Sequence, residues 1–143
     1  MTETIVTGRR VGEVPRAGVE LGGALGAIAE ARDFTTSFLD RSAPSSGPWP
    51  ERGVDAARLV VSELVTNVVK YAPGPCRLEL ALDDGVLEIS VHDTHPVAPV
   101  ARPRNPDRLG QHGLEIVLAL CDTVETEAAA PHGKWVRARL PLG

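Results

Sequence analysis

The sequence contains few aromatic residues, few lysines and few cysteines. Aromatic residues make up 3% of the 143 residues, the lysines are Lys70 and Lys134, and the cysteines are Cys76 and Cys121. Both cysteines lie in apolar segments without the paired spacing of a disulfide or metal motif, so we interpret them as small buried side chains. No run approaches the roughly 18 to 20 apolar residues of a membrane helix, and the N-terminus lacks the apolar core of a signal peptide. We therefore expect a cytoplasmic protein that does not contact a membrane.

The balance of charge is slightly acidic. Lys and Arg number 15 and Asp and Glu number 19, which gives a net charge of -4 at pH 7. A surface that holds a nucleic-acid backbone needs an excess of positive charge, so direct binding to nucleic acid is not expected. Hydrophobic residues make up 43% and charged residues 24% of the chain, which is typical of a globular protein of one domain. We assign residues 1–20 to a flexible N-terminal lead-in and residues 21–143 to a single domain.

Apolar spacing and chain breakers define three helices. Apolar residues recur at intervals of three and four in the first helix, Asp55 is the expected N-cap of the second, and Pro73-Gly74-Pro75 ends the second. Before the third helix lies a proline-rich loop without periodicity, and loops of this length often act as lids. The predicted helices are residues 24–40, 55–72 and 113–121, and the loop is residues 94–110.

Alternating apolar residues predict the strands of one sheet. These strands are a short one near residues 19–21, two joined by a tight turn at Asp84-Gly85, and two near the C-terminus. The last two carry glutamates and arginines that alternate with apolar residues, so one sheet face is expected to be solvated and the other covered by helices. The predicted fold is an α/β two-layer sandwich, a mixed, mainly antiparallel sheet with about three helices on one face. The four longer strands are residues 77–82, 86–93, 123–129 and 134–140.

The second predicted helix contains a carboxylate that requires an explanation. Its central segment is apolar nearly all round except for Glu63, and burying a charge costs several kcal/mol unless it is paired, solvated or protonated. Asn67 lies one helical turn further on the same stripe, with Lys70 close behind, so the three side chains could line one cavity. The alternative is a helix edge at which Glu63 meets solvent or pairs with Arg58 or Lys70.

A second carboxylate, Asp93, ends a predicted strand. The alternation of apolar residues in residues 86–93 places Asp93 on the covered face, where it could accept hydrogen bonds from a ligand; the alternative is a turn aspartate that caps local amides. The cluster His92, Asp93 and His95 suggests a metal site only weakly, because neighbouring residues of a strand point to opposite faces.

Two glycine motifs complete the set of candidate residues. Gly110-Gln111-His112-Gly113 precedes Leu114 at the start of a helix, where glycines and free N–H groups favour a phosphate, although a short Gly-x-x-Gly is weak by itself. Gly133-Lys134 is weaker, and a hairpin turn is its simpler explanation.

In order and spacing, these motifs together resemble the ATP-binding domain shared by gyrase, histidine kinases and anti-sigma factor kinases, the Bergerat or histidine kinase-like ATPase fold. The resemblance covers residues 24–142, and Ser62-Glu63-Leu64-Val65-Thr66-Asn67 followed by Tyr71-Ala72 looks most like the anti-sigma regulatory factor (serine-protein kinase) branch. The resemblance implies ATP and Mg²⁺ as cofactors, with Glu63 as the catalytic base, Asn67 as the magnesium ligand and Asp93 as the partner of the adenine amino group. It further implies nucleotide contacts from Lys70, Thr94, Arg108, Gly110, His112, Gly113, Leu114 and Lys134.

The same resemblance implies an activity and partners. The activity is phosphorylation of a serine or threonine in an anti-anti-sigma (STAS-type) protein, by a protein that also sequesters a sigma factor and that forms a homodimer. Two positions depart from the family pattern: His95 stands where a glycine is common, and His112 stands where an arginine is common. They favour an alternative, a non-catalytic module that keeps the fold and binds a sigma factor or its antagonist.

Overall fold

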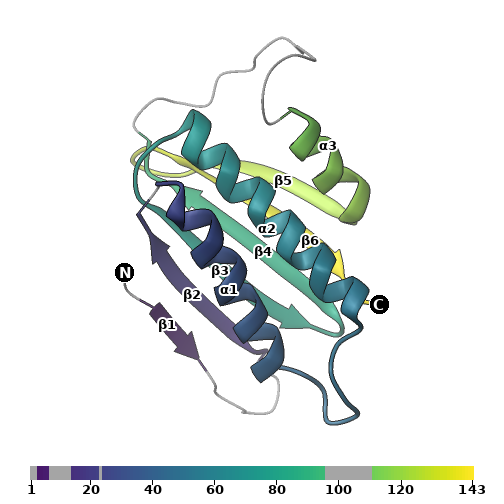
Figure 1. Cartoon of the computed structure of the whole chain (residues 1–143). Coiled ribbons are helices and arrows are strands. Elements are labelled where there is room, and N and C mark those ends of the chain that lie inside the picture. Colours follow the sequence, from purple (N-terminus) through teal and green to yellow (C-terminus); the bar gives the residue numbers. More distant parts are fainter. Residues whose placement is uncertain (1–2, 7–13, 23, 96–110) are drawn as a thin grey trace.

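Six strands form one sheet, and helices lie on one of its faces (Figure 1). The computed structural model describes residues 3–6, 14–22, 24–95 and 111–143, without the side chains of residues 3–6, 111 and 112. Every pairing between neighbouring strands in this part of the chain is antiparallel, in the order β1-β2-β3-β4-β6-β5. The strands are β1 (Glu3–Val6), β2 (Arg16–Leu21), β3 (Cys76–Asp83), β4 (Val86–Asp93), β5 (Thr123–Ala128) and β6 (Lys134–Pro141).

The helices are α1 (Gly26–Arg41), α2 (Glu51–Tyr71) and α3 (Gln111–Leu120). In Figure 1, α1 and α2 run side by side across the sheet, and α3 lies beside α2 near β5. The α/β two-layer sandwich predicted from the sequence is therefore confirmed, as are the three helices and the hairpin turn, where Asp84 and Gly85 have φ values of 52° and 76°. Within the described helices, no segment is long and apolar enough to cross a membrane.

The N-terminal strands extend further than the sequence analysis expected. Strand β2 begins at Arg16, and it pairs with β1 on one side and β3 on the other. Residues 3–6 and 16–20, which we had assigned to the lead-in, are thus part of the sheet. The alternation of apolar and polar residues in β2 is hard to recognise in the sequence, because Ala17 and Gly18 have little apolar character. In the structure, Ala17, Val19 and Leu21 are all at most 5% exposed and face the core.

Helix α2 begins four residues earlier than predicted. Pro50, not Asp55, occupies the N-cap, with φ -55° and ψ 139°, and its carbonyl accepts hydrogen bonds from the Gly53 and Val54 amides at 3.0 and 3.1 Å. Proline suits the start of a helix because it needs no intrahelical partner for an N–H group. Asp55 is instead an exposed residue inside the helix.

The core lies between the helices and the inner face of the sheet. On β3 and β4 the inward residues are apolar and nearly inaccessible, whereas their neighbours along each strand point outward. The buried residues of the two strands on this face are Cys76, Leu78, Leu80, Leu82, Leu87, Ile89, Val91 and Asp93. Apolar contact along this face supplies the main driving force for packing α1 and α2 onto the sheet.

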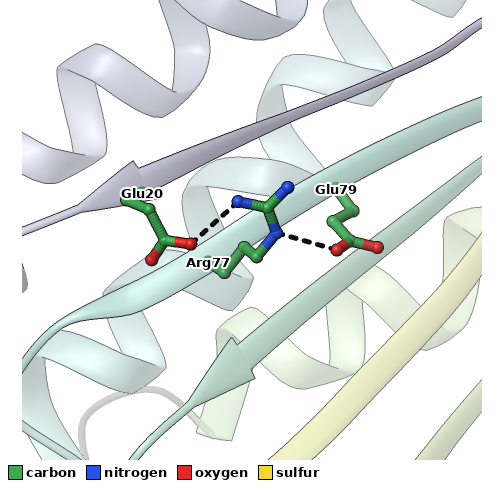
Figure 2. Close-up of polar contacts among 3 residues, drawn as sticks. All are labelled: Glu20, Arg77 and Glu79. Atoms are coloured by element: carbon green, nitrogen blue, oxygen red, sulfur yellow. Dashed lines mark hydrogen bonds and ion pairs between the residues drawn. The ribbon is translucent and has the colours of Figure 1, made fainter. Parts of the chain in front are cut away.

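The outer face carries ion pairs between strands. Arg77 on β3 donates to Glu20 on β2 and to Glu79, each at 2.8 Å (Figure 2). Its guanidinium lies over Gly18, where a Cβ atom would overlap with it. The predicted solvated face with paired glutamates and arginines is confirmed, since Arg137 donates to Glu127 at 2.7 Å.

The pairing of the other outer-face arginine differs from the simplest expectation. Arg139 donates to Glu88 on β4 at 3.1 Å, and its register neighbour on β5 is Thr123. The ion pairs therefore link β6 to the strands on both of its sides. Exposed pairs of this kind contribute up to about 1 kcal/mol each, so they set register more than they stabilise the fold.

The first turn of α2 gives a test of the packing. Gly53 is buried against the carbonyl of Leu142, and a Cβ atom at this position would overlap with that backbone oxygen, whereas the space around Gly26 at the start of α1 is open. We predict that Gly53→Ala lowers the free energy of unfolding by about 1–3 kcal/mol. Gly26→Ala should leave it unchanged or raise it by up to about 1 kcal/mol, because alanine favours a helix. Denaturant titration of both variants measures the difference; equal stabilities would contradict the packing.

Candidate functional site

Three elements that carry candidate site residues meet at one end of the sheet. The C-terminal half of α2, the end of β4 and the start of β6 meet there, at the upper left in Figure 1. Asp93 and Lys134 are register partners on β4 and β6, and both are on the face that α2 covers. Polar side chains thus occupy one end of an otherwise apolar interface.

Glu63 lies against the start of α3. It is half-buried, and its carboxylate oxygen Oε2 is in contact with the position that a Cβ atom of Gly113 would take. Glycine is therefore required at position 113 if Glu63 is to keep its place. The structure brings together Glu63 and Gly113, two residues predicted independently from the sequence, and Leu114 beside them is 39% exposed. The arginine considered as an alternative partner of Glu63 donates elsewhere, since Arg58 bonds the Thr36 hydroxyl at 3.1 Å.

Asn67 contains a buried oxygen without a hydrogen-bond partner. It lies one helical turn after Glu63, and its Oδ1 atom is inaccessible and accepts no hydrogen bond among the described residues. Leaving a buried acceptor unpaired costs about 1–3 kcal/mol, so a structure keeps one only where another contact compensates. An amide oxygen is a hard ligand of the kind that magnesium takes, usually together with waters and phosphate oxygens. The residues present therefore fit a magnesium ion held by Asn67.

Asp93 is the most deeply buried charged residue of the described chain. It is 3% exposed, its Oδ2 atom accepts from Lys134 Nζ at 2.7 Å, and its Oδ1 atom accepts from the His95 amide at 3.1 Å. The inward orientation predicted from the strand period is confirmed. The backbone at this point is also tightly packed, because Gly133, with φ +91°, lies against the Asp93 carbonyl and leaves no room for a Cβ atom. Gly133 both closes the turn before β6 and supports Asp93.

Cys76 is a neighbour of Asp93 that the sequence analysis did not include in the site. It is 1% exposed and is the register partner of Asp93 on β3. Burial and the negative charge of Asp93 raise the pKa of the Cys76 thiol to about 11. The alternation from Cys76 to Leu82 could have placed this thiol on the inner face beside Asp93. The buried Cys76 thiol is therefore uncharged and forms an apolar surface beside Asp93.

The remaining predicted residues take different positions. Lys70 is exposed on the last turn of α2, and Thr94 is exposed and donates to the Pro75 carbonyl at 3.2 Å. Arg108 and Gly110 lie outside the described residues, as does the side chain of His112. None of these positions contradicts the predicted nucleotide contacts, which stay predictions.

The histidine cluster does not form a metal site. His92 points to the outer face, where its ring stacks on Trp135 with the centroids 4.6 Å apart, while Asp93 points inward. Within the described part of the chain, no group of three or more histidine, cysteine, aspartate or glutamate residues is placed to hold a metal ion. The argument from the strand period is confirmed.

Comparison with known proteins identifies the family. A family model described as the histidine kinase-like ATPase domain matches residues 23–140. The chain belongs to this family. It is also similar to the histidine kinase domain of the Erythrobacter litoralis EL346 blue-light activated histidine kinase, with a TM-score of 0.51 and 20% sequence identity. That match covers 82% of this chain and 60% of the other, and at this identity it shows the fold alone. No curated protein sequence matches the chain.

The family assignment confirms the coarser part of the resemblance. The chain is an ATP-binding domain of the histidine kinase-like ATPase type, and the match spans α1 through β6. The end of the sheet where the C-terminal half of α2, the end of β4 and the start of β6 meet is therefore the candidate nucleotide site.

The raised pKa values of the two thiols give a test of how well the folded chain protects them from reaction. Both Cys76 and Cys121 have a pKa of about 11 in place of 9.0, so at pH 8 the thiolate fraction falls about a hundredfold. We predict that both thiols of the folded chain react with a disulfide reagent at least about a hundredfold more slowly than those of the chain unfolded in guanidinium, because the thiolate is the reactive form. Absorbance of the released thiol follows the reaction. A rapidly reacting Cys76 in the folded chain would contradict its burial beside Asp93, whereas Cys121 is only half-buried.

Proposed function

We propose that the protein binds Mg-ATP and transfers the γ-phosphoryl group to a serine or threonine hydroxyl of an anti-anti-sigma partner, while it also sequesters a sigma factor. The observation that carries the proposal is the arrangement on α2, where the Glu63 carboxylate lies against Gly113 in the first turn of α3, and the Asn67 oxygen, which has no partner among the described residues, lies one turn further along α2. A carboxylate and a metal-ligating amide at this spacing supply the two groups that phosphoryl transfer to a hydroxyl needs.

The chemistry divides between these residues. Glu63 would accept the proton of the attacking hydroxyl while the hydroxyl oxygen bonds to the γ-phosphorus and the bond from that phosphorus to the bridging oxygen breaks, which releases ADP. Asn67 would hold magnesium through Oδ1. When bound, the ion would neutralise charge that develops on the phosphate oxygens. Asp93 would bind the adenine ring, so that nucleobase binding and proton transfer would depend on different residues.

The partners follow from the family branch that the Ser62 to Asn67 motif resembles. A sigma factor and its STAS-type antagonist are the expected partners, with a homodimer as the assembly and the cytoplasm as the compartment. Direct contact with nucleic acid is not part of the proposal, in agreement with the net charge of -4. Affinity capture from native cells, followed by transfer of labelled phosphate from ATP to the captured proteins, tests both partners and activity.

A second candidate function rests on the hydrogen bonds that Asp93 already accepts within the chain. Both oxygens of the carboxylate that should bind adenine already accept hydrogen bonds, from Lys134 and from the amide of His95, which stands where the family often has glycine. A site occupied in this way favours a module that binds its partners and transfers no phosphate. Recovery of a sigma factor or antagonist that never becomes labelled would support this function over the kinase.

Replacing Glu63 tests its proposed role as the general base. We predict that Glu63→Gln keeps the dissociation constant of Mg-ATP within about threefold and lowers the rate of phosphate transfer by about 10²–10⁴, the usual contribution of a general base. Glutamine keeps the volume beside Gly113, so folding should be retained. Calorimetry measures the binding, and labelled phosphate on the partner measures the transfer. An undiminished rate would show that Glu63 is only a polar residue at the edge of the helix.

Replacing Asn67 tests the proposed metal ligand. We predict that Asn67→Ala weakens magnesium-dependent nucleotide binding by about tenfold or more, since even indirect metal contacts are worth that much. The melting temperature should hardly change, because Oδ1 makes no hydrogen bond to a described residue that the variant would lose. Thr66→Ala is the matched control, since its hydroxyl bonds the Ser62 carbonyl within α2 at 2.6 Å. Equal affinities of the two variants would contradict the assignment.

A further inference from the structure

The ion pair between Asp93 and Lys134 changes which nucleobases the adenine-binding end of the candidate site can recognise. Lys134 Nζ lies 2.7 Å from Asp93 Oδ2, and the two residues are register partners on the inner face of β4 and β6. The lysine side chain is 28% exposed, whereas that of Asp93 is 4% exposed. A ligand that enters from solvent therefore meets the ammonium before it meets the carboxylate.

Among the described residues, the two charged groups have unused hydrogen-bonding capacity. An ammonium has three donors, and one of the three in Lys134 is directed to Asp93. A carboxylate has about four acceptor positions, and two of those in Asp93 are used, by Lys134 and by the His95 amide. The pair thus presents at least one donor and one acceptor side by side to a ligand.

A carboxylate alone would select strictly for adenine. Adenine carries an amino group, a donor, at position 6, while guanine and hypoxanthine carry an oxygen there, an acceptor. An acceptor set against a carboxylate is left unpaired and repelled, and such a repulsive contact is an effective source of specificity. A neighbouring ammonium removes this repulsion when a 6-oxopurine lies one atom further along the pair than adenine does, because the ammonium then donates to O6 while the carboxylate accepts from the N1–H group of the same base.

We propose that Asp93 and Lys134 together recognise the position-6 edge of a purine, so that the site accepts 6-oxopurine nucleotides as well as ATP. This inference rests on the proposed nucleotide binding and adds the class of base to it. Lys134 is then a specificity-determining residue: with adenine it donates to N1 while Asp93 accepts from the amino group, and with a 6-oxopurine the lysine donates to O6.

Nucleotide affinities of the full chain test the inference. We expect the dissociation constant of Mg-ITP to lie within about tenfold of that of Mg-ATP when both are measured by calorimetry. In Lys134→Met the ratio of the two constants should rise by about ten- to hundredfold against Mg-ITP, the usual discrimination from a paired base edge. The ratio is the measurement, because a partial loss of folded protein affects both nucleotides equally.

Three controls make the result specific. Arg139→Met removes a cation from the outer face of the same strand and should leave the ratio unchanged. Lys134→Arg keeps the charge and the donors and should keep most of the tolerance for Mg-ITP. Mg-GTP adds an amino group at position 2; binding of Mg-ITP with rejection of Mg-GTP would still support recognition at position 6, with the larger base excluded by its shape.

The failures of the two proposals can be told apart. Wild-type protein that binds Mg-ATP and rejects Mg-ITP by more than about a hundredfold would overturn the role of Lys134 and leave the nucleotide site intact, and this measurement needs no variant. An unchanged ratio in Lys134→Met would do the same. Absence of binding by every nucleotide would overturn both the inference and the proposed function on which it rests.

Discussion

The ion pair of Asp93 and Lys134 is the constraint on which the candidate site depends. It stands at the end of a sheet face whose other residues on β3 and β4 are apolar, so the buried Asp93 carboxylate loses its solvation, while the Lys134 ammonium stays partly exposed. A buried carboxylate is tolerated only when it keeps its partner, because removing the partner leaves its charge uncompensated at a cost of up to about 3–5 kcal/mol. The pair therefore adds little net free energy of folding, but replacing either residue alone is costly. A charged pair with this property fits a role in binding a ligand.

Two glycines link the loops to this polar end of the sheet. Gly113 lets α3 approach the Glu63 carboxylate, and Gly133 lets the turn before β6 approach the Asp93 carbonyl. In each case a Cβ atom would displace the acidic residue or its backbone. The glycines therefore leave the room that Glu63 and the Asp93 backbone occupy, and they do so from elements that are remote in the sequence. Only Gly133 also needs glycine for its φ of +91°.

The sequence predicted the fold well because its strong patterns extend over whole elements. The apolar stripes of α1 and α2, the alternation of β3 and β4 and the turn at Asp84-Gly85 each admit one interpretation. The prediction was wrong where the signal was weak: the first half of β2 contains Ala17 and Gly18, which carry little apolar character, and Pro50, not Asp55, occupies the N-cap of α2. Local patterns also placed Asp93 inward, but they could not pair it with Lys134, because that contact depends on the register between β4 and β6.

The two ends of the candidate site lie on different layers of the sandwich. Glu63 and Asn67 belong to α2, whereas Asp93 and Lys134 belong to the sheet, and no hydrogen bond joins the two pairs among the described residues. Residues without shared partners usually contribute independently to binding, so the choice of base and the handling of phosphate can vary separately. If both proposals hold, a change at Lys134 on β6 alters the choice of base and leaves Glu63 and Asn67 on α2 in place.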